Sequence, residues 1–168
     1  EGDLAIIDED LTIFNFKEGL LVNRKVTSID WDAEQAQKGD FDHYFMKEVS
    51  EQAEVMNKIA AISDKQIIEL ADEIRNASGL FFVACGTAAH ACINGMYLFS
   101  KIAKRHVNFC VASEFPHFHH FLNPKSLIVV ISQSGETADT LAAIRSAKAQ
   151  GSKVMSIVNV MGSSVMRA

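Results

Sequence analysis

One polar turn of the chain combines the residue types that bind anions. The segment SQSGET, residues 132–137, directly follows the apolar run at residues 127–131 and directly precedes a helical pattern that begins near Ala138. The start of a helix leaves several backbone N–H groups without partners and carries a partial positive charge, so it stabilises an anion without a lysine or arginine. The position of this turn between a strand and a helix therefore predicts a phosphate-binding site.

The side chains of this turn strengthen the prediction. Gly135 can adopt the positive φ angle that lets successive N–H groups converge on one point. Ordinary helix capping would explain part of the pattern, but one cap does not need three hydroxyls, an amide and a glycine within six residues. The side chains that can donate hydrogen bonds to an anion are Ser132, Gln133, Ser134 and Thr137.

Two carboxylates lie in or beside this turn. A carboxylate next to a phosphate is repulsive, so we expect the side chain of Glu136 to point out of the pocket. Asp139 falls in the first turn of the predicted helix, where a negative charge interacts favourably with the helix dipole. Neither residue is therefore expected to oppose anion binding.

A second turn of the same kind occurs earlier, in the segment ACGTAAH at residues 84–90. Gly86 allows a close backbone approach, and Thr87 offers a hydroxyl. The segment matches neither G-x-G-x-x-G nor G-x-x-x-x-G-K-[ST], so it indicates neither a dinucleotide nor a nucleoside triphosphate. If the two strands before these turns are neighbours, Thr87 lies close to the turn that begins at Ser132.

The two turns require a sheet whose strands end at one edge. Apolar runs predict strands at residues 80–84, 107–111, 126–132 and 153–158. Helical patterns are found at residues 42–61, 64–76, 88–104, 114–121 and 138–150. Near-continuous apolar strands that alternate with helices predict an α/β fold, a three-layer α/β/α domain with a parallel sheet. Ligands of such sheets bind beyond the carboxyl ends of the strands.

The N-terminal part of the chain has a different pattern. Short β-like runs at residues 4–7, 11–16 and 20–29, separated by turn signals, predict a small antiparallel meander. The polar stretch at residues 33–40 has no strong periodicity and predicts a connector. We therefore expect a short antiparallel β segment followed by the α/β domain.

Composition excludes several classes of partner. With 168 residues and 48% hydrophobic content, the chain can bury one substantial core. A formal net charge of -5 and a pI of about 5.6 argue against nucleic acids and anionic membranes. The apolar runs are too short to span a membrane and no leader opens the sequence, so we expect a cytoplasmic protein.

Cysteine and histidine could carry other chemistry. The three cysteines lie in or beside apolar segments without C-x-x-C spacing, which predicts reduced, mostly buried thiols at Cys85, Cys92 and Cys110. Cys85 ends a strand and could be a nucleophile, although no base adjoins it in sequence. A closed metal site needs three or four ligands, so we expect a solvated or interface patch rather than a metal at His117, His119 and His120.

The motifs together resemble the sugar isomerase (SIS) domain family and, within it, the glutamine–fructose-6-phosphate aminotransferases. The SQSGET segment alone would indicate only some SIS domain, whereas the segment from Trp31 to Gln52 narrows the resemblance to the aminotransferases. The segments that carry it are WDAEQAQKGDFDHYFMKEVSEQ at residues 31–52, ACGT at 84–87, ASEF at 112–115, SQSGETADT at 132–140 and NVMGSS at 159–164.

The resemblance implies a division of the chain and a role for each site residue. Residues 1–36 would be the last strands of a glutaminase domain with its linker, and residues 37–168 most of the first of two SIS domains, truncated at its C-terminus. Ser132, Gln133, Ser134 and Thr137 would hold the phosphate of the sugar, and Thr87 would help to bind the sugar. This chain has Ala88 where many members have a serine, and residues 116–120 depart from a more basic pattern.

The family reaction would transfer ammonia from glutamine to fructose 6-phosphate and isomerise the product to glucosamine 6-phosphate, in a homodimer without a cofactor or metal. The family's catalytic groups would precede Glu1 or follow Ala168, so we expect these residues alone to bind the sugar phosphate without catalysis. Two alternatives stay open, a non-enzymatic SIS module that senses a sugar phosphate and a phosphosugar isomerase. The meander and the segment around Trp31 favour the aminotransferase, since neither alternative needs them.

Overall fold

The computed structural model describes residues 2–25, 37–62 and 64–168, and the chain forms two compact units, Glu1–Asn57 and Lys58–Ala168. Residues 26–36 lie outside the described residues. The predicted domain boundary after residue 36, the segment around Trp31, the end of the predicted strand at residues 20–29 and the first part of the predicted connector fall there. These predictions therefore stay predictions.

The N-terminal unit contains the predicted antiparallel meander. Its strands are β1 (Asp3–Ile7), β2 (Leu11–Asn15) and β3 (Leu20–Leu21), in the order β1-β2-β3. The predicted third strand was too long, because within the described residues the pairing with β2 ends at Leu21. Soon after this point Arg24 reaches across to Asp3 of β1, with 2.9 Å between Nε and Oδ2.

Helix α1 (Tyr44–Ala60) follows the meander in the chain and buries none of its residues. The second unit begins at Lys58, in the last turn of α1, and its first complete helix is α2 (Asp64–Asn76), whose bounds agree with the sequence prediction. Among the described residues, no helix has the length and apolar character that a membrane crossing requires.

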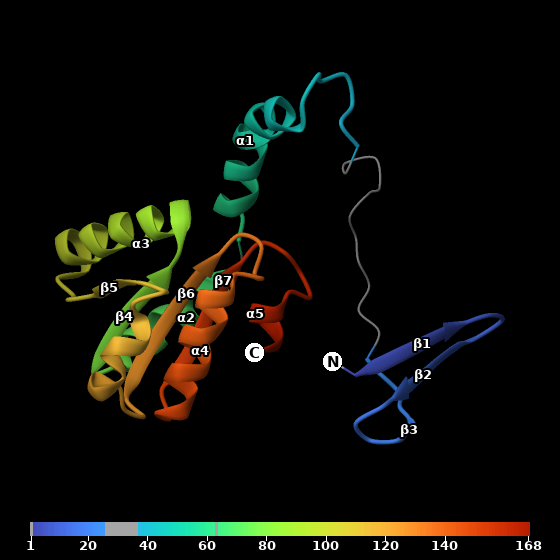
Figure 1. The fold of residues 1–168 in the computed structure, drawn as a ribbon. Helices are drawn as coiled ribbons and strands as arrows, with labels where there is room; N and C mark the ends of the chain where they lie inside the picture. The colour runs from blue at the N-terminus through green and yellow to red at the C-terminus, as the bar shows by residue number, and fades with distance from the viewer. Residues whose placement is uncertain (1, 26–36, 63) are drawn as a thin grey trace. The chain divides into compact units, whose positions relative to one another are not determined.

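A four-stranded parallel sheet forms the centre of the second unit, with the strand order β5-β4-β6-β7 (Figure 1). The four strands confirm the predicted runs to within one residue at each end. Their bounds are β4 (Gly79–Ala84), β5 (Asn108–Val111), β6 (Ser126–Ser132) and β7 (Lys153–Val158). The sheet lies between helices on both faces, which confirms the predicted three-layer α/β/α fold.

Both faces of the two central strands, β4 and β6, are buried, which explains why these strands read as nearly continuous apolar runs. On one face, Phe81 and Val83 of β4 join a core cluster with Ile144 of α4 (Ala138–Ala149). On the other face, Leu80 and Phe82 join a cluster with α2 and α3 (Gly86–Leu98). Alternate residues of β4 thus pack into two different core clusters, one on each face of the sheet. The loops at the carboxyl edge of the sheet follow directly from these packed strands.

Two predicted helices differ in kind from the regular α-helix. The predicted helix at residues 88–104 is α3 followed by a π-helical turn, η2 (Phe99–Ala103), and it ends where Lys104 takes a φ of 52°. The predicted helix at residues 114–121 is instead a 3₁₀-helix, η3 (Phe115–Phe121). A period of three residues places Phe115 and Phe118 on one side, and both rings pack on Phe81, at 5.7 and 6.4 Å between centroids.

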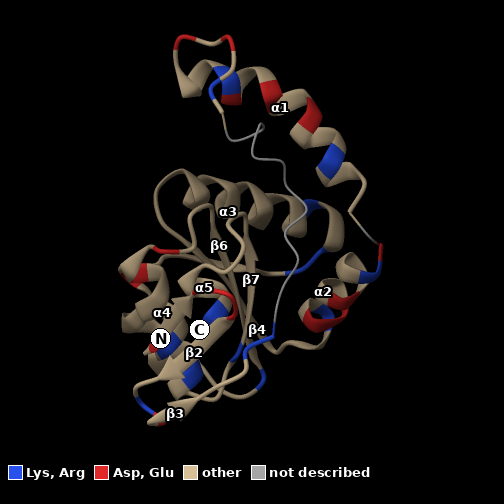
Figure 2. Cartoon of the chain, turned by 90° about the vertical axis from the view of Figure 1, so that its right-hand side faces the viewer, with Lys and Arg blue, Asp and Glu red and all other residues tan. Residues whose placement is uncertain are grey.

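Figure 2 shows how the charged residues are distributed over these elements. Both α1 and α2 carry acidic and basic residues, whereas α3 carries no lysine, arginine, aspartate or glutamate in its sequence GTAAHACINGMYL. The N-terminus of α3 therefore faces its surroundings with backbone groups and small side chains alone.

Candidate anion-binding site

The carboxyl ends of β4 and β6 lie side by side, because the two central strands pair in parallel with Val83 opposite Val130. The loop after β4 leads into α3 and the loop after β6 leads into α4 (Figure 1). Between these loops lies a cavity of about 270 Å³. Its lining consists of Cys85, Gly86, Thr87, Ala88, Ile131, Ser132, Gln133, Ser134, Thr137 and Thr140.

All five residues that the sequence assigned to the site line this one cavity. Thr87 comes from the first loop, and the other four, Ser132, Gln133, Ser134 and Thr137, come from the second. The strand pairing brings the two loops together although they are 45 residues apart in the sequence, the separation of Thr87 and Ser132. The predicted closeness of Thr87 to the second turn is therefore confirmed.

The second loop is shaped by hydrogen bonds between its own hydroxyls and backbone. The N–H of Gly135 donates to Oγ of the buried Ser132 at 3.0 Å, and the N–H of Glu136 donates to Oγ of Ser134 at 3.2 Å. In both bonds the hydroxyl oxygen accepts, so each hydroxyl proton is left for another acceptor. An anion in the cavity would be such an acceptor.

Gly135 is required by both its conformation and its surroundings. Its φ is 68°, in the region that residues with a Cβ rarely adopt, as the sequence predicted. A Cβ at this position would also lie 2.2 Å from Oγ and 2.5 Å from Cβ of Ser163. Ser163, which precedes α5 (Ser164–Arg167), is buried directly against Gly135. The loop can approach the segment behind it only through a glycine.

Glu136 is exposed and is not among the residues that line the cavity. Its Oε1 accepts a hydrogen bond of 2.8 Å from the backbone N–H of Ser164. Hydrogen bonding to Ser164, through its side chain and then its backbone, lowers the pKa of Glu136 from its ordinary value, and Arg167 adds a smaller electrostatic effect. The carboxylate is thus ionised and directed toward α5, as the predicted outward orientation requires.

Two helix N-termini converge on the cavity. Helix α3 has Cys85 as its N-cap residue and α4 has Thr137, and neither side chain makes a capping hydrogen bond. The first N–H groups of both helices consequently lack a partner within the helix. No charged side chain is among the lining residues, all of which belong to the described part of the chain. The positive potential of this cavity therefore comes from backbone dipoles.

Five lining residues were not assigned to the site from the sequence, namely Cys85, Gly86, Ala88, Ile131 and Thr140. Thr140 is buried and follows Thr137 by three residues, so helical spacing alone would have placed both on one side of α4. Cys85 lines the cavity because it directly follows β4, and Ile131 because it is the residue before the last one of β6. Ala88 also lines the cavity, so a serine at this position would add a hydroxyl to it.

The other candidate residues lie elsewhere. Burial raises the pKa of Cys92 to about 11 and also raises that of Cys110, so these two thiols are buried and neutral, as predicted. The three clustered histidines lie on η3, where Nδ1 of His119 is 2.8 Å from the carbonyl oxygen of Pro116. Within the part of the chain that the structure describes, no three His, Cys, Asp or Glu side chains are placed to hold a metal.

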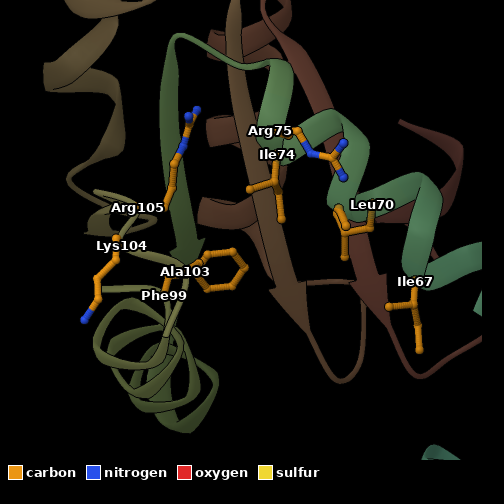
Figure 3. Close-up of a pocket in the computed structure, with 9 residues that line it drawn as sticks. Ile67, Leu70, Ile74, Arg75, Phe99, Ala103, Lys104 and Arg105 are labelled. Carbon is orange, nitrogen blue, oxygen red and sulfur yellow. The ribbon is translucent and has the colours of Figure 1, made fainter. Parts of the chain in front are cut away.

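A larger groove of about 560 Å³ lies between α2 and η2 (Figure 3). Leu70 and Ile74 of α2 and Phe99 of η2 project into it, and basic side chains from Arg75, Lys104 and Arg105 lie at its margins. None of its lining residues, which are all described, carries a hydroxyl group. This groove therefore lacks the hydroxyl donors that distinguish the smaller cavity, and its polar groups are the three cations.

Comparison with known proteins places this geometry in a family. Residues 73–168 match the model of the SIS domain family. The C-terminal domain of glucosamine-fructose-6-phosphate aminotransferase from Francisella tularensis superimposes with a TM-score of 0.67 and 36% identity, covering 78% of this chain and 38% of that one. An Escherichia coli protein in complex with A5P has a TM-score of 0.62 at 19% identity, covering 77% of this chain and 69% of its own, and shows the fold alone.

The chain is also similar in sequence to curated proteins named glutamine–fructose-6-phosphate aminotransferase (isomerizing). The protein from Methanothermobacter thermautotrophicus is 40% identical over 99% of this chain, and the protein from Clostridium acetobutylicum is 38% identical over 100% of it. The chain spans 28% and 29% of the lengths of these two relatives.

Proposed function

The chain belongs to the SIS domain family, and on this basis we propose that the cavity between the loops after β4 and β6 binds the phosphate group of a sugar phosphate. The observation that carries the proposal is the convergence of two uncapped helix N-termini on a cavity lined by hydroxyls and without a charged side chain. Backbone N–H groups and neutral donors hold a dianion without the desolvation of a lysine or arginine.

Each polar group of the cavity has a part in this proposal. Ser132, Gln133, Ser134 and Thr137 bind the phosphate oxygens together with the first N–H groups of α4, and Thr87 binds the sugar from the opposite loop. Hydrogen bonds to a charged group contribute about 1.5 to 3 kcal/mol each, so four or five give roughly micromolar to millimolar affinity after the cost of association. Binding of this strength is accessible to calorimetry.

We further propose that the whole protein is a glutamine-dependent aminotransferase that converts fructose 6-phosphate to glucosamine 6-phosphate. The relatives with this name align with 98% to 100% of the chain, including the residues before the SIS match begins at residue 73. A sensing module or a phosphosugar isomerase does not require that N-terminal part. Glutamine would be handled by the domain whose last strands form the meander.

The compartment and the oligomeric state of the protein are part of the same proposal. The free thiols of Cys85, Cys92 and Cys110 support a reducing compartment, so we propose a cytoplasmic protein, and the family resemblance supports a homodimer. Because the chain spans about 28% of its curated relatives, we expect these 168 residues to bind the sugar phosphate without forming glucosamine 6-phosphate.

Calorimetric titration with fructose 6-phosphate and with fructose tests the proposal. We expect the chain to bind the phosphorylated sugar only, and Ser134→Ala to weaken that binding. Ser156→Ala is the matched control, because Ser156 is an exposed serine of β7 outside the cavity lining, and it should leave the affinity unchanged. Equal binding of the two sugars, or equal effects of the two substitutions, would contradict the proposal.

A further inference from the structure

We infer that Glu136 is a positioning residue for the phosphate-binding loop, because its carboxylate fastens the loop to the segment at residues 162–167 and thereby holds its own negative charge away from the cavity. This inference rests on the proposed function of the same cavity. It gives a role to a residue that contacts no ligand.

Two consecutive loop residues accept hydrogen bonds from two consecutive N–H groups of this segment. The bond between Glu136 and Ser164 is called the tie below. The N–H of Ser164 donates to Oε1 of Glu136 at 2.8 Å, and the N–H of Val165 donates to the carbonyl oxygen of Gly135 at 2.9 Å. Val165 is buried in the core cluster that contains Val83 of β4. The segment is therefore anchored in the core, and the loop takes its position from that anchor.

The contact between Gly135 and Ser163 fixes how closely the two segments approach. The Ser163 side chain is fully buried, and its Oγ has no hydrogen-bond partner among the described residues. A buried hydroxyl without a partner costs free energy. The close approach of Gly135 and Ser163 brings Ser164 within reach of Glu136.

Electrostatics give the same tie a second effect. Glu136 precedes Thr137, which lines the cavity, so an untied carboxylate could turn toward a bound anion and repel it. In the structure the carboxylate charge is stabilised at α5 by the N–H of Ser164 and by the nearby Arg167. The tie thus supports the shape of the loop and removes a repulsive charge from the site.

Three substitutions of Glu136 distinguish a positioning role from that of a surface charge without effect on binding. Glu136→Gln removes the charge but keeps an oxygen that can accept from Ser164. Glu136→Ala removes both the charge and the acceptor, and Glu136→Asp keeps the charge on a side chain one methylene shorter, too short to reach Ser164 in the same way. If the hydrogen bond to Ser164 positions the loop, Glu136→Gln should preserve the binding of fructose 6-phosphate. Glu136→Ala and Glu136→Asp should weaken it.

The experiment is a calorimetric titration of the chain and its variants with fructose 6-phosphate. We expect Glu136→Gln to bind within about twofold of the parent, and Glu136→Ala to bind about three- to tenfold more weakly, the equivalent of one hydrogen bond. Glu136→Asp should bind at least as weakly as Glu136→Ala, and added salt should reduce the difference between them. Circular dichroism confirms that each variant is folded.

Asp139→Asn is the matched control, because it removes a carboxylate in the first turn of α4 without touching the tie to Ser164. Asp139→Asn should therefore not weaken the binding of fructose 6-phosphate as Glu136→Ala does. If Glu136→Ala binds as tightly as Glu136→Gln, the inference is overturned, although the proposed function stands. If the parent chain does not distinguish fructose 6-phosphate from fructose, the proposed function itself fails.

Discussion

Replacement of Gly135 by alanine is the most informative single perturbation of this fold. The residue has a φ of 68°, and an added Cβ would lie 2.2 Å from Oγ of Ser163, 2.5 Å from its Cβ and 2.9 Å from Cγ1 of Val158. Contacts below 3.0 Å cannot persist, so the loop after β6 and the segment after β7 must move apart. The substitution therefore affects stability and the shape of the cavity together.

The expected loss has two parts. A left-handed conformation costs alanine about 1 to 2 kcal/mol relative to glycine. Overpacking against well-packed neighbours adds about 1 to 3 kcal/mol. Together we expect the free energy of unfolding to fall by roughly 2 to 5 kcal/mol, with the second part caused by the contact with Ser163.

Urea denaturation followed by circular dichroism measures this loss. Gly162→Ala is the matched control, because Gly162 has a φ of 70° and no atom within 4 Å of an added Cβ, so only the backbone cost applies. The double variant Gly135→Ala/Ser163→Gly should recover the overpacking part. The reasoning is refuted if Gly135→Ala costs no more than Gly162→Ala, or if removal of the Ser163 side chain recovers nothing.

Three further predictions concern cysteines and the cavity lining. Cys85 lines the cavity and is half-buried, so we expect its alkylation by iodoacetamide to be slowed by fructose 6-phosphate but not by fructose, and equal rates would contradict its placement. Ala88→Ser adds a hydroxyl at the cavity, so we expect fructose 6-phosphate to bind about three- to tenfold more tightly by calorimetry, whereas unchanged affinity would show that this position does not reach the ligand. The pKa of Cys92 is raised from 9.0 to about 11, so the folded state holds its proton more tightly and the free energy of unfolding should be constant below pH 9 and fall as the pH rises toward 11. Cys92→Ala should reduce that slope in urea denaturation at each pH, and an unchanged slope would argue against the burial of this thiol.

Much of the fold could be predicted because its signals are local. The strands Gly79–Ala84 and Ser126–Ser132 lie between polar loops and are nearly continuous apolar runs, since both of their faces are covered. The position of a hydroxyl-rich turn at the end of such a strand was enough to predict four residues that line one cavity, while their role in binding stays a proposal. The fifth, Thr87, followed from the expectation that the two strands are neighbours.

Features that depend on distant contacts could not be read from the sequence. The 3₁₀ geometry of Phe115–Phe121 is coupled to the packing of its aromatic rings on Phe81, a residue of β4. The tie between Glu136 and Ser164 joins residues 28 positions apart through a backbone N–H, which leaves no trace in residue type. The ion pair between Arg24 and Asp3 joins residues 21 positions apart, which the spacing of the sequence does not indicate.

The central claim is that two helix N-termini and the hydroxyls between them bind the phosphate of a sugar phosphate. The most direct test is a ¹H–¹⁵N correlation spectrum of the chain during titration with fructose 6-phosphate. We predict that the largest amide shifts fall at residues 86–88, 132–137 and 138–140, and that fructose does not produce them. Shifts concentrated in the groove around Phe99 and Leu70, with the amides of the two loops unmoved, would contradict the account.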